Sequence, residues 1–229
     1  MVVSNARLLT NWTSYLVAAY FAKDWDTSLE IWDSIVEILG DDPRSMCKVN
    51  ELNEIFLFRV KIFVGREDYK KGIKFIIKNK KYIVDDYRRN EALVDLYMRA
   101  GQTRKAVECL EELLKLNSCN SKYYKQILHA EGVEEDQEKI RETLAKYEEV
   151  LPKSNTHTRL AIELLDASPE WEEKLAQYMR PMIIKGVPSL INEMRSLYND
   201  PAKTKMLGNV LLAMCKSMEA EMTLAPSDD

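Results

Sequence analysis

Apolar residues recur at helical spacing along most of this chain, and the clearest example lies between residues 88 and 118. Leu93, Val94 and Tyr97 fall on one face of a helix, and Gly101 then interrupts the pattern. A second amphipathic run follows, with apolar residues at Ala106, Cys109, Leu110, Leu113 and Leu114. The pattern predicts two antiparallel helices joined by a tight turn, in which Gly101 takes a left-handed conformation.

The same pattern returns at a spacing of 34 residues. Gly72 precedes Ala106 by that interval, and a small residue is expected where the second helix crosses closely over the first. Leu144 follows Leu110 by the same interval, at a position that favours a large apolar side chain. This later hairpin departs from the pattern with Glu131 at the position of Tyr97 and Ile140 at the small position, so we expect it to splay or shift slightly. The order and period resemble the tetratricopeptide repeat.

The N-terminal stretch fits the same template, with matching residues at Trp12, Ala19, Ser28 and Trp32. Ser28 lies 44 residues before Gly72, which indicates an insertion of about ten residues near positions 40–49. We therefore expect the tryptophans to belong to the core rather than to a base-stacking surface.

After residue 154 the repeat fades, and turn residues bracket four further helices near 157–166, 169–184, 188–198 and 201–221. The sequence thus predicts an all-α fold, a right-handed α-solenoid of tetratricopeptide-type hairpins. We expect regular hairpins over 1–154, degenerate hairpins that continue the solenoid over 155–221, and a disordered tail over 222–229.

Composition supports a helical protein and offers little catalytic chemistry. Only seven glycines and seven prolines occur in 229 residues, which favours long helices with short connections. The four cysteines form no CxxC pair and only two histidines, His129 and His157, are present, so we expect buried free thiols and no metal site. No phosphate-binding glycine motif occurs, which predicts no cofactor site and no enzyme activity. The start lacks a signal-peptide pattern and no long apolar run follows, so we expect a cytoplasmic protein.

Charge is spread unevenly along the chain. The net charge is −4, yet the block from Arg59 to Lys105 holds fourteen Lys and Arg against six Asp and Glu. Such a block can mark a surface for nucleic acid or an acidic partner. It can equally be the solvated face of several helices, which is the commoner case.

Helical repeat arrays usually bind partners in a concave groove lined by the first helix of each hairpin. The template places six candidate groove residues there: Lys61, Arg88, Arg99, Lys122, Lys125 and His129. Most are basic, which favours an acidic partner. The carboxylate clamp of chaperone-binding repeats is disfavoured, because Thr13 and Val17 occupy the positions of its Lys and Asn.

Several segments resemble one family in more than their period: DWDTSLEIWDSI, NEIFLFRVKIF and EALVDLYMRAGQTRKAVECLEELL. They are similar to the large auxiliary subunit of the N-terminal acetyltransferase A complex. The more diagnostic segments, LPKSNTHTRLAIELL and KGVPSLINEMRSLYND, lie outside the regular repeats. The matching residues are Arg159, Leu160, Lys185, Gly186, Pro188, Ser196, Leu197 and Tyr198. TRLAIELL departs from the family pattern, which tends to carry a second Arg and a proline there.

The resemblance covers the whole chain and implies part of the N-terminal half of a longer scaffold subunit. Such a subunit wraps a small GNAT-type catalytic subunit, which holds the acetyl-CoA site, and helps it meet nascent chains at the ribosome. The basic block then has a possible use against ribosomal RNA. Two alternatives stay open: a generic adaptor that grips an acidic peptide or protein in its groove, and direct RNA binding through the basic block.

Overall fold

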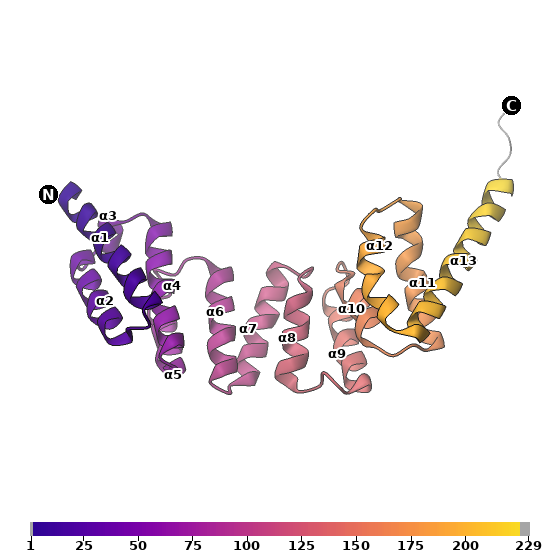
Figure 1. The fold of residues 1–229 in the computed structure, drawn as a ribbon, viewed down its shortest axis with the longest axis horizontal. Helices are drawn as coiled ribbons and strands as arrows, with labels where there is room; N and C mark the ends of the chain where they lie inside the picture. The colour runs from indigo at the N-terminus through magenta and orange to yellow at the C-terminus, as the bar shows by residue number, and fades with distance from the viewer. Residues whose placement is uncertain (1, 225–229) are drawn as a thin grey trace, which may run out of the picture. The chain divides into compact units, whose positions relative to one another are not determined.

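The computed structural model describes the backbone of residues 2–224 and the side chains of residues 9–217. Throughout the described backbone the regular structure is helical, which confirms the all-α prediction (Figure 1). Contacts divide the chain into two compact units, Met1–Asn117 and Ser118–Asp229, which we call unit 1 and unit 2. The expected division near residue 154 stays a prediction, because it concerns repeat regularity rather than compactness.

Unit 1 is a succession of helical hairpins. Its elements are α1 (Val2–Phe21), α2 (Trp25–Leu39), the short α3 (Pro43–Met46), α4 (Val49–Gly65), α5 (Tyr69–Lys78), α6 (Asp86–Arg99) and α7 (Thr103–Leu116). Helices α1 and α2, α4 and α5, and α6 and α7 pair within hairpins, and α5 also packs on α6. The predicted insertion near 40–49 contains α3.

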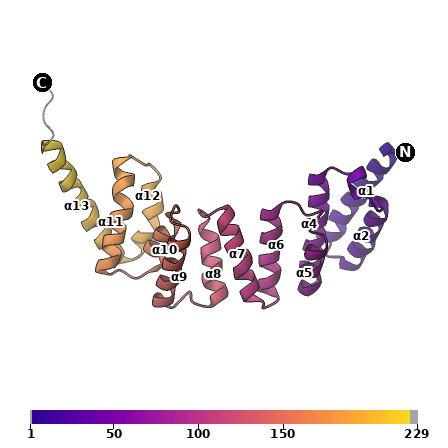
Figure 2. The same ribbon diagram turned by 180° about the vertical axis from the view of Figure 1, so that it is seen from behind.

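Unit 2 continues with elements that vary more in length and include a 3-10 helix. They are α8 (Ser121–Glu131), α9 (Gln137–Val150), α10 (Thr156–Leu164), α11 (Pro169–Ile184), α12 (Leu190–Glu193), the 3-10 helix η1 (Met194–Asn199) and α13 (Pro201–Leu224). Figure 2 shows α11, α12 and α13 from behind. The helix expected over 188–198 is therefore a short α-helix followed by a 3-10 turn. Helix α13 extends to Leu224, into the segment predicted as a tail, and residues 225–229 lie outside the described part of the chain.

A left-handed residue closes the turn inside each of four successive hairpins. Gly101 has φ +68° as predicted, and Gly132 has the same φ between α8 and α9. The equivalent turns before α2 and α5 use Lys23 at φ 57° and Glu67 at φ 61°. A side chain in this region is strained by about 1–2 kcal/mol, because its Cβ approaches the following carbonyl oxygen. The chain thus keeps the turn geometry even where glycine is absent.

The small positions of the repeat are buried at close helix crossings. Ser28 and Ala106 are 0% exposed. A Cβ added at Gly72 would lie 3.0 Å from a methyl carbon of Leu96 and 3.3 Å from Cβ of Phe63, which explains the glycine there. In unit 2, where Ile140 takes the small position, α8 and α9 pack less closely than α6 and α7. The looser packing agrees with the splayed or shifted hairpin expected from Glu131 and Ile140.

Aromatic side chains fill the core of unit 1. The rings of Trp32, Phe56 and Phe75 lie within 5.5–5.8 Å of one another, and Trp32 is 4% exposed. Trp12 and Trp25 are partly buried against this core. In unit 2 Trp171 is 4% exposed. The predicted core role of the tryptophans is confirmed.

Candidate partner-binding groove

The first helices of the unit 1 hairpins, α1, α4 and α6, border two hollows. One of about 310 Å³ is lined by Tyr20, Leu57, Val60, Lys61, Val64, Arg88, Glu91, Ala92 and Asp95. The other, of about 410 Å³, is lined by Leu9, Thr10, Thr13, Met46, Cys47, Glu51, Glu54 and Ile55. Helix α4 separates the two hollows and contributes to both. Together they form what we call the unit 1 groove, on the helices where the repeat template places a binding surface.

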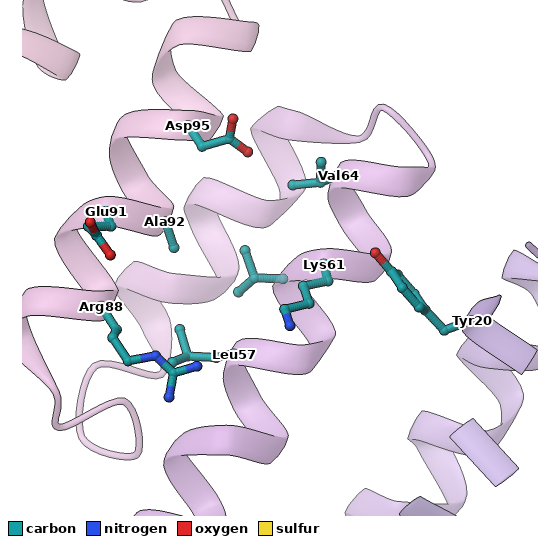
Figure 3. Close-up of a pocket in the computed structure, with 9 residues that line it drawn as sticks. Tyr20, Leu57, Lys61, Val64, Arg88, Glu91, Ala92 and Asp95 are labelled. Carbon is teal, nitrogen blue, oxygen red and sulfur yellow. The ribbon is translucent and has the colours of Figure 1, made fainter. Parts of the chain in front are cut away.

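Figure 3 shows the residues that line the hollow between α4 and α6, including its charged side chains. Arg88, Glu91 and Asp95 follow one another along α6, and Lys61 lies opposite them on α4. The Lys61 side chain is exposed, and its ammonium nitrogen lies 5.7 Å from the Phe58 ring centre. Of the predicted groove residues, Lys61 and Arg88 line this hollow directly.

Carboxylates of unit 1 pair with both arginines of the predicted groove set. Arg88 forms an ion pair with Glu54, which lies one repeat earlier on α4. Arg99 Nε donates to Asp95 Oδ1 at 2.8 Å, and this hydrogen bond raises the pKa of Arg99. The charges of these arginines are therefore balanced within the chain. Unit 1 is less attractive to an acidic partner than the sequence pattern suggested.

The remaining groove candidates lie on α8 in unit 2. Lys125 Nζ donates to Glu163 Oε1 of α10 at 2.8 Å, and His129 Nδ1 lies 2.9 Å from Glu134 Oε2. Lys122 is exposed at the start of the same helix. The structure thus divides the six candidates between two units, and at least four of them have carboxylate partners.

The basic block is most concentrated on α5 and the turn after it. We call this surface the lysine ridge; it comprises Lys70, Lys71, Lys74, Lys78, Lys80 and Lys81, all exposed. Helix α5 is the second helix of its hairpin, and none of these lysines lines the hollows of the groove. The lysine ridge therefore lies outside the groove, to which the basic block contributes Lys61 and Arg88.

Arg59, also in the basic block, is partly buried against the aromatic core and does not belong to the ridge. Its guanidinium carbon lies 4.7 Å from the Phe63 ring centre and 5.5 Å from that of Trp32. Burial lowers the pKa of Arg59 to about 10, and the nearby Asp33 carboxylate opposes this shift. The arginine stabilises the aromatic cluster through cation–π contacts.

His157 is buried in the first turn of α10, facing α9 and α11. Its Nε2 lies 3.9 Å from Glu148 Oε1, and its Nδ1 has no hydrogen-bond partner. Arg141 and Lys174 line the same small cavity of about 70 Å³. Burial lowers the pKa of His157, the Glu148 carboxylate opposes this shift, and Lys174 reinforces it. His157 is thus a neutral core residue at neutral pH.

The described side chains provide little material for a metal site. No group of three His, Cys, Asp or Glu is close enough to hold an ion within residues 9–217. All four cysteines are free thiols, as predicted. Burial raises the pKa of Cys47 and of Cys109, which keeps them unreactive. The expectation that all four are buried is wrong, because Cys119 and Cys215 are exposed.

Sequence reasoning missed Lys203, whose side chain joins three helices of unit 2. The residue lies on α13 and is 7% exposed. Its ammonium group donates to the carbonyl oxygen of Glu163 at 2.9 Å, near the end of α10, and lies 5.8 Å from the Trp171 ring centre on α11. Trp171 Nε1 donates to the carbonyl oxygen of Ile162 at 3.0 Å. Together these contacts satisfy carbonyl groups that a helix end leaves without partners.

Comparison with known proteins identifies the family. The family "N-terminal acetyltransferase A, auxiliary subunit" matches residues 50–229. The chain belongs to this family. It is thus grouped with auxiliary subunits of the acetyltransferase rather than with an enzyme family, as the sequence resemblance predicted.

The relatives that this chain matches are several times longer than the chain itself. The NAA15 auxiliary subunit of Arabidopsis thaliana is 25% identical over 226 residues, which span 95% of this chain and 25% of the relative. NAA16 of Mus musculus is 23% identical, with 96% and 25% covered. A solved structure of Naa15 with Naa10, bound to HypK-THB, superposes with a TM-score of 0.75 at 21% identity. It covers 91% of this chain and 32% of that one, and its likeness shows the fold, an array of helical hairpins.

The residues that carry the family resemblance lie on α10 and around α12. Leu160 and Leu197 are buried at 0% and 2% exposure. Gly186 has φ +62°, and its amide donates to the carbonyl oxygen of Ile183. The K-G-x-P segment therefore ends α11 with a left-handed glycine. Four further residues of the family resemblance are exposed: Lys185, Pro188, Ser196 and Tyr198.

Arg159 of the auxiliary-subunit motif lies near a buried hydrogen-bonded pair. Tyr178 on α11 donates to Glu193 Oε2 on α12 at 2.8 Å, and Ser189 donates to the other oxygen at 3.2 Å. Burial raises the pKa of Tyr178 and the bond to Glu193 adds to the rise, whereas the positive charge of Arg159 opposes it. Arg159 of α10 thus acts electrostatically on a tyrosine that links α11 to α12.

Among the described residues, no helix is both long enough and apolar enough to cross a membrane.

Proposed function

We propose that this chain is a non-catalytic scaffold segment of an N-terminal acetyltransferase A complex, which binds the catalytic GNAT-type subunit. Membership of the auxiliary-subunit family is the observation that carries the proposal. The hairpin array resembles that of Naa15, which has been solved together with Naa10. Stacked hairpins offer large, rigid surfaces, which suit a subunit that positions another protein.

Ribosome association is the second part of the proposal. The lysine ridge on α5 supports it, because a row of exposed ammonium groups attracts the phosphates of ribosomal RNA. The complex would then work in the cytoplasm, where nascent chains emerge. The groove candidates on α8, of which Lys122 is exposed, support the alternative that the chain is an adaptor for an acidic partner.

Co-expression with a catalytic subunit of the same complex tests the first part. We expect the tagged chain, in its longest natural form, to retain the catalytic subunit through purification and to change its activity or substrate choice. A catalytic subunit that neither co-purifies nor changes its activity would refute the scaffold proposal.

Sedimentation with ribosomes tests the second part. Lys70, Lys74 and Lys78 would each be replaced by Glu, and a control would carry the same change at three exposed lysines of unit 2, Lys122, Lys153 and Lys205. We expect the ridge variant to lose most ribosome binding and to show a shallower salt dependence, because fewer counterions are released. Equal losses in both variants would exclude a specific role for the ridge.

The adaptor alternative makes a different prediction. Reversing the charge of Arg99 and Lys125 should abolish binding of an acidic peptide if the first helices grip it. Unchanged affinity would count against that alternative without affecting the scaffold proposal.

A further inference from the structure

The unit 1 groove carries an excess of negative charge, although part of its lining comes from the basic block Arg59–Lys105. Four carboxylates line its hollows, those of Glu51, Glu54, Glu91 and Asp95, against the two cations Lys61 and Arg88. Including Arg99, which pairs with Asp95, still leaves the carboxylates in excess. The lysine ridge, on α5 and the turn after it, lies outside the groove. Most of the lysines that lie between Glu54 and Glu91 in the sequence are therefore on a different surface from these carboxylates.

Apolar side chains form much of the groove. Leu57, Val60, Val64 and Ala92 line the hollow between α4 and α6. On α1, Thr13, Val17 and Tyr20 share one helical face, because they are spaced by four and three residues. Val17 is 38% exposed on this face, and Phe21, the last residue of α1, is 76% exposed. Apolar surface rimmed by charges is typical of a protein-binding site.

We propose that the unit 1 groove binds a basic amphipathic segment of another protein, with apolar residues on one face and Lys or Arg on the other. Its apolar face would fill the two hollows, in the way that amphipathic helices occupy apolar grooves. Its cations would face Glu51, Glu91 and the Glu54–Arg88 pair. Thr13 and Val17 offer no positive charge for an acidic peptide. The inference goes beyond the proposed scaffold role, since neither the catalytic subunit nor ribosomal RNA is needed for it.

Two labelled model peptides of equal length serve as probes for the full 229-residue chain. One is an amphipathic helix of Leu and Lys, and the other has Glu in place of every Lys. Fluorescence anisotropy should show tighter binding of the Lys peptide. Equal affinity for both peptides would overturn the proposal. Tighter binding of the Glu peptide would also overturn it and would assign the groove to an acidic partner.

Lys61→Glu gives a test that misfolding cannot imitate, because it should strengthen binding. Reversing the charge of the cation that lines the same hollow as Glu91 and Asp95 should tighten binding of the Lys peptide by about fivefold, as expected for one partly exposed charge. Lys74→Glu is the matched control, with the same change on an exposed α5 residue. Equal tightening in both variants would show that only net charge matters and would overturn the groove assignment.

Glu91→Lys provides the opposite change on the facing helix. It should weaken the Lys peptide by about fivefold, whereas Glu37→Lys on the exposed side of α2 should have little effect. Sedimentation of the same variants measures self-association and so tests whether a second copy of this chain occupies the groove. Self-association that Glu91→Lys alone changes would mean that the groove binds another copy of this chain, and would overturn the proposal. Loss of the scaffold role is judged separately, by co-purification with the catalytic subunit.

Discussion

Lys203 holds α13 against α10 and α11, and replacing it by methionine should weaken that part of unit 2. Methionine keeps the apolar stem but removes the ammonium group. The carbonyl oxygen of Glu163, now 2.9 Å from Lys203 Nζ, would lose this donor. The carbonyl oxygen of Ile162, 3.5 Å from Lys203 Nζ, would keep Trp171 Nε1 as a donor at 3.0 Å. The cation over the Trp171 ring would be lost as well.

The magnitude follows from these contacts. A hydrogen bond from a charged donor contributes about 1.5–3 kcal/mol, and a cation over an aromatic ring contributes about 0.5–2 kcal/mol. The side chain is 7% exposed, so removing its charge also relieves the desolvation of a buried ammonium, which offsets part of the loss. We expect the free energy of unfolding to fall by about 2 kcal/mol. With a urea m-value of about 2.5 kcal/mol/M, the midpoint falls by about 0.8 M.

Urea unfolding and amide hydrogen exchange together measure this effect. The two compact units need not unfold in one step, so exchange at the amides of α10 and α13 localises the loss to unit 2. Lys205→Met is the matched control, because Lys205 lies on the same helix and is exposed. If Lys203→Met is as stable as Lys205→Met, with the same exchange in α10, the ammonium contacts do not stabilise the unit and the reasoning is wrong.

Three further predictions concern the turns, a buried histidine and a helix crossing. Glu67→Gly should raise the free energy of unfolding by about 0.5–1 kcal/mol by removing left-handed strain, whereas Gly101→Ala should lower it by about 1 kcal/mol; urea midpoints that shift in the same direction would contradict this. Burial lowers the pKa of His157, so the unfolded chain gains a proton first and stability should fall as the pH drops below about 6.5. His157→Gln should flatten this decline and His129→Gln should retain it, so pH-dependent melting curves that show the reverse would exclude His157 as the cause. Ala106→Leu should lower the free energy of unfolding by about 1–3 kcal/mol through overpacking, and an unchanged Tm would show that the crossing tolerates a large residue.

The regular part of the fold was predictable because its determinants are local and repeated. Small residues at Ser28, Gly72 and Ala106 and the glycine at position 101 appear at recognisable intervals, and each lies where the template places it. The Glu54–Arg88 pair could also have been found, because the two residues lie one repeat apart. Lys125 and Glu163 lie 38 residues apart, outside that period, so a step of one repeat misses their contact.

For the candidate site, the repeat template indicated which helices border a hollow but did not indicate the charge of that hollow. The template located the first helices correctly enough to put Lys61 and Arg88 in a hollow. It selected basic residues, however, and left out the carboxylates that accompany them. The sign of the net charge in the groove depends on all side chains that converge from α1, α4 and α6. The sequence of a single helix therefore does not reveal it.

The sequence by itself determined the helices, the hairpin turns and the family, because periodicity, turn residues and motif residues such as Gly186 and Pro188 are written locally along the chain. The tertiary structure alone decided which charges are neutralised, which lie in the groove and which face outward on α5. It also placed Lys203 of α13 at the end of α10, about 40 residues away. These outcomes depend on side chains from separate helices meeting in space, and electrostatic and hydrogen-bond energies depend on those distances rather than on order in the chain.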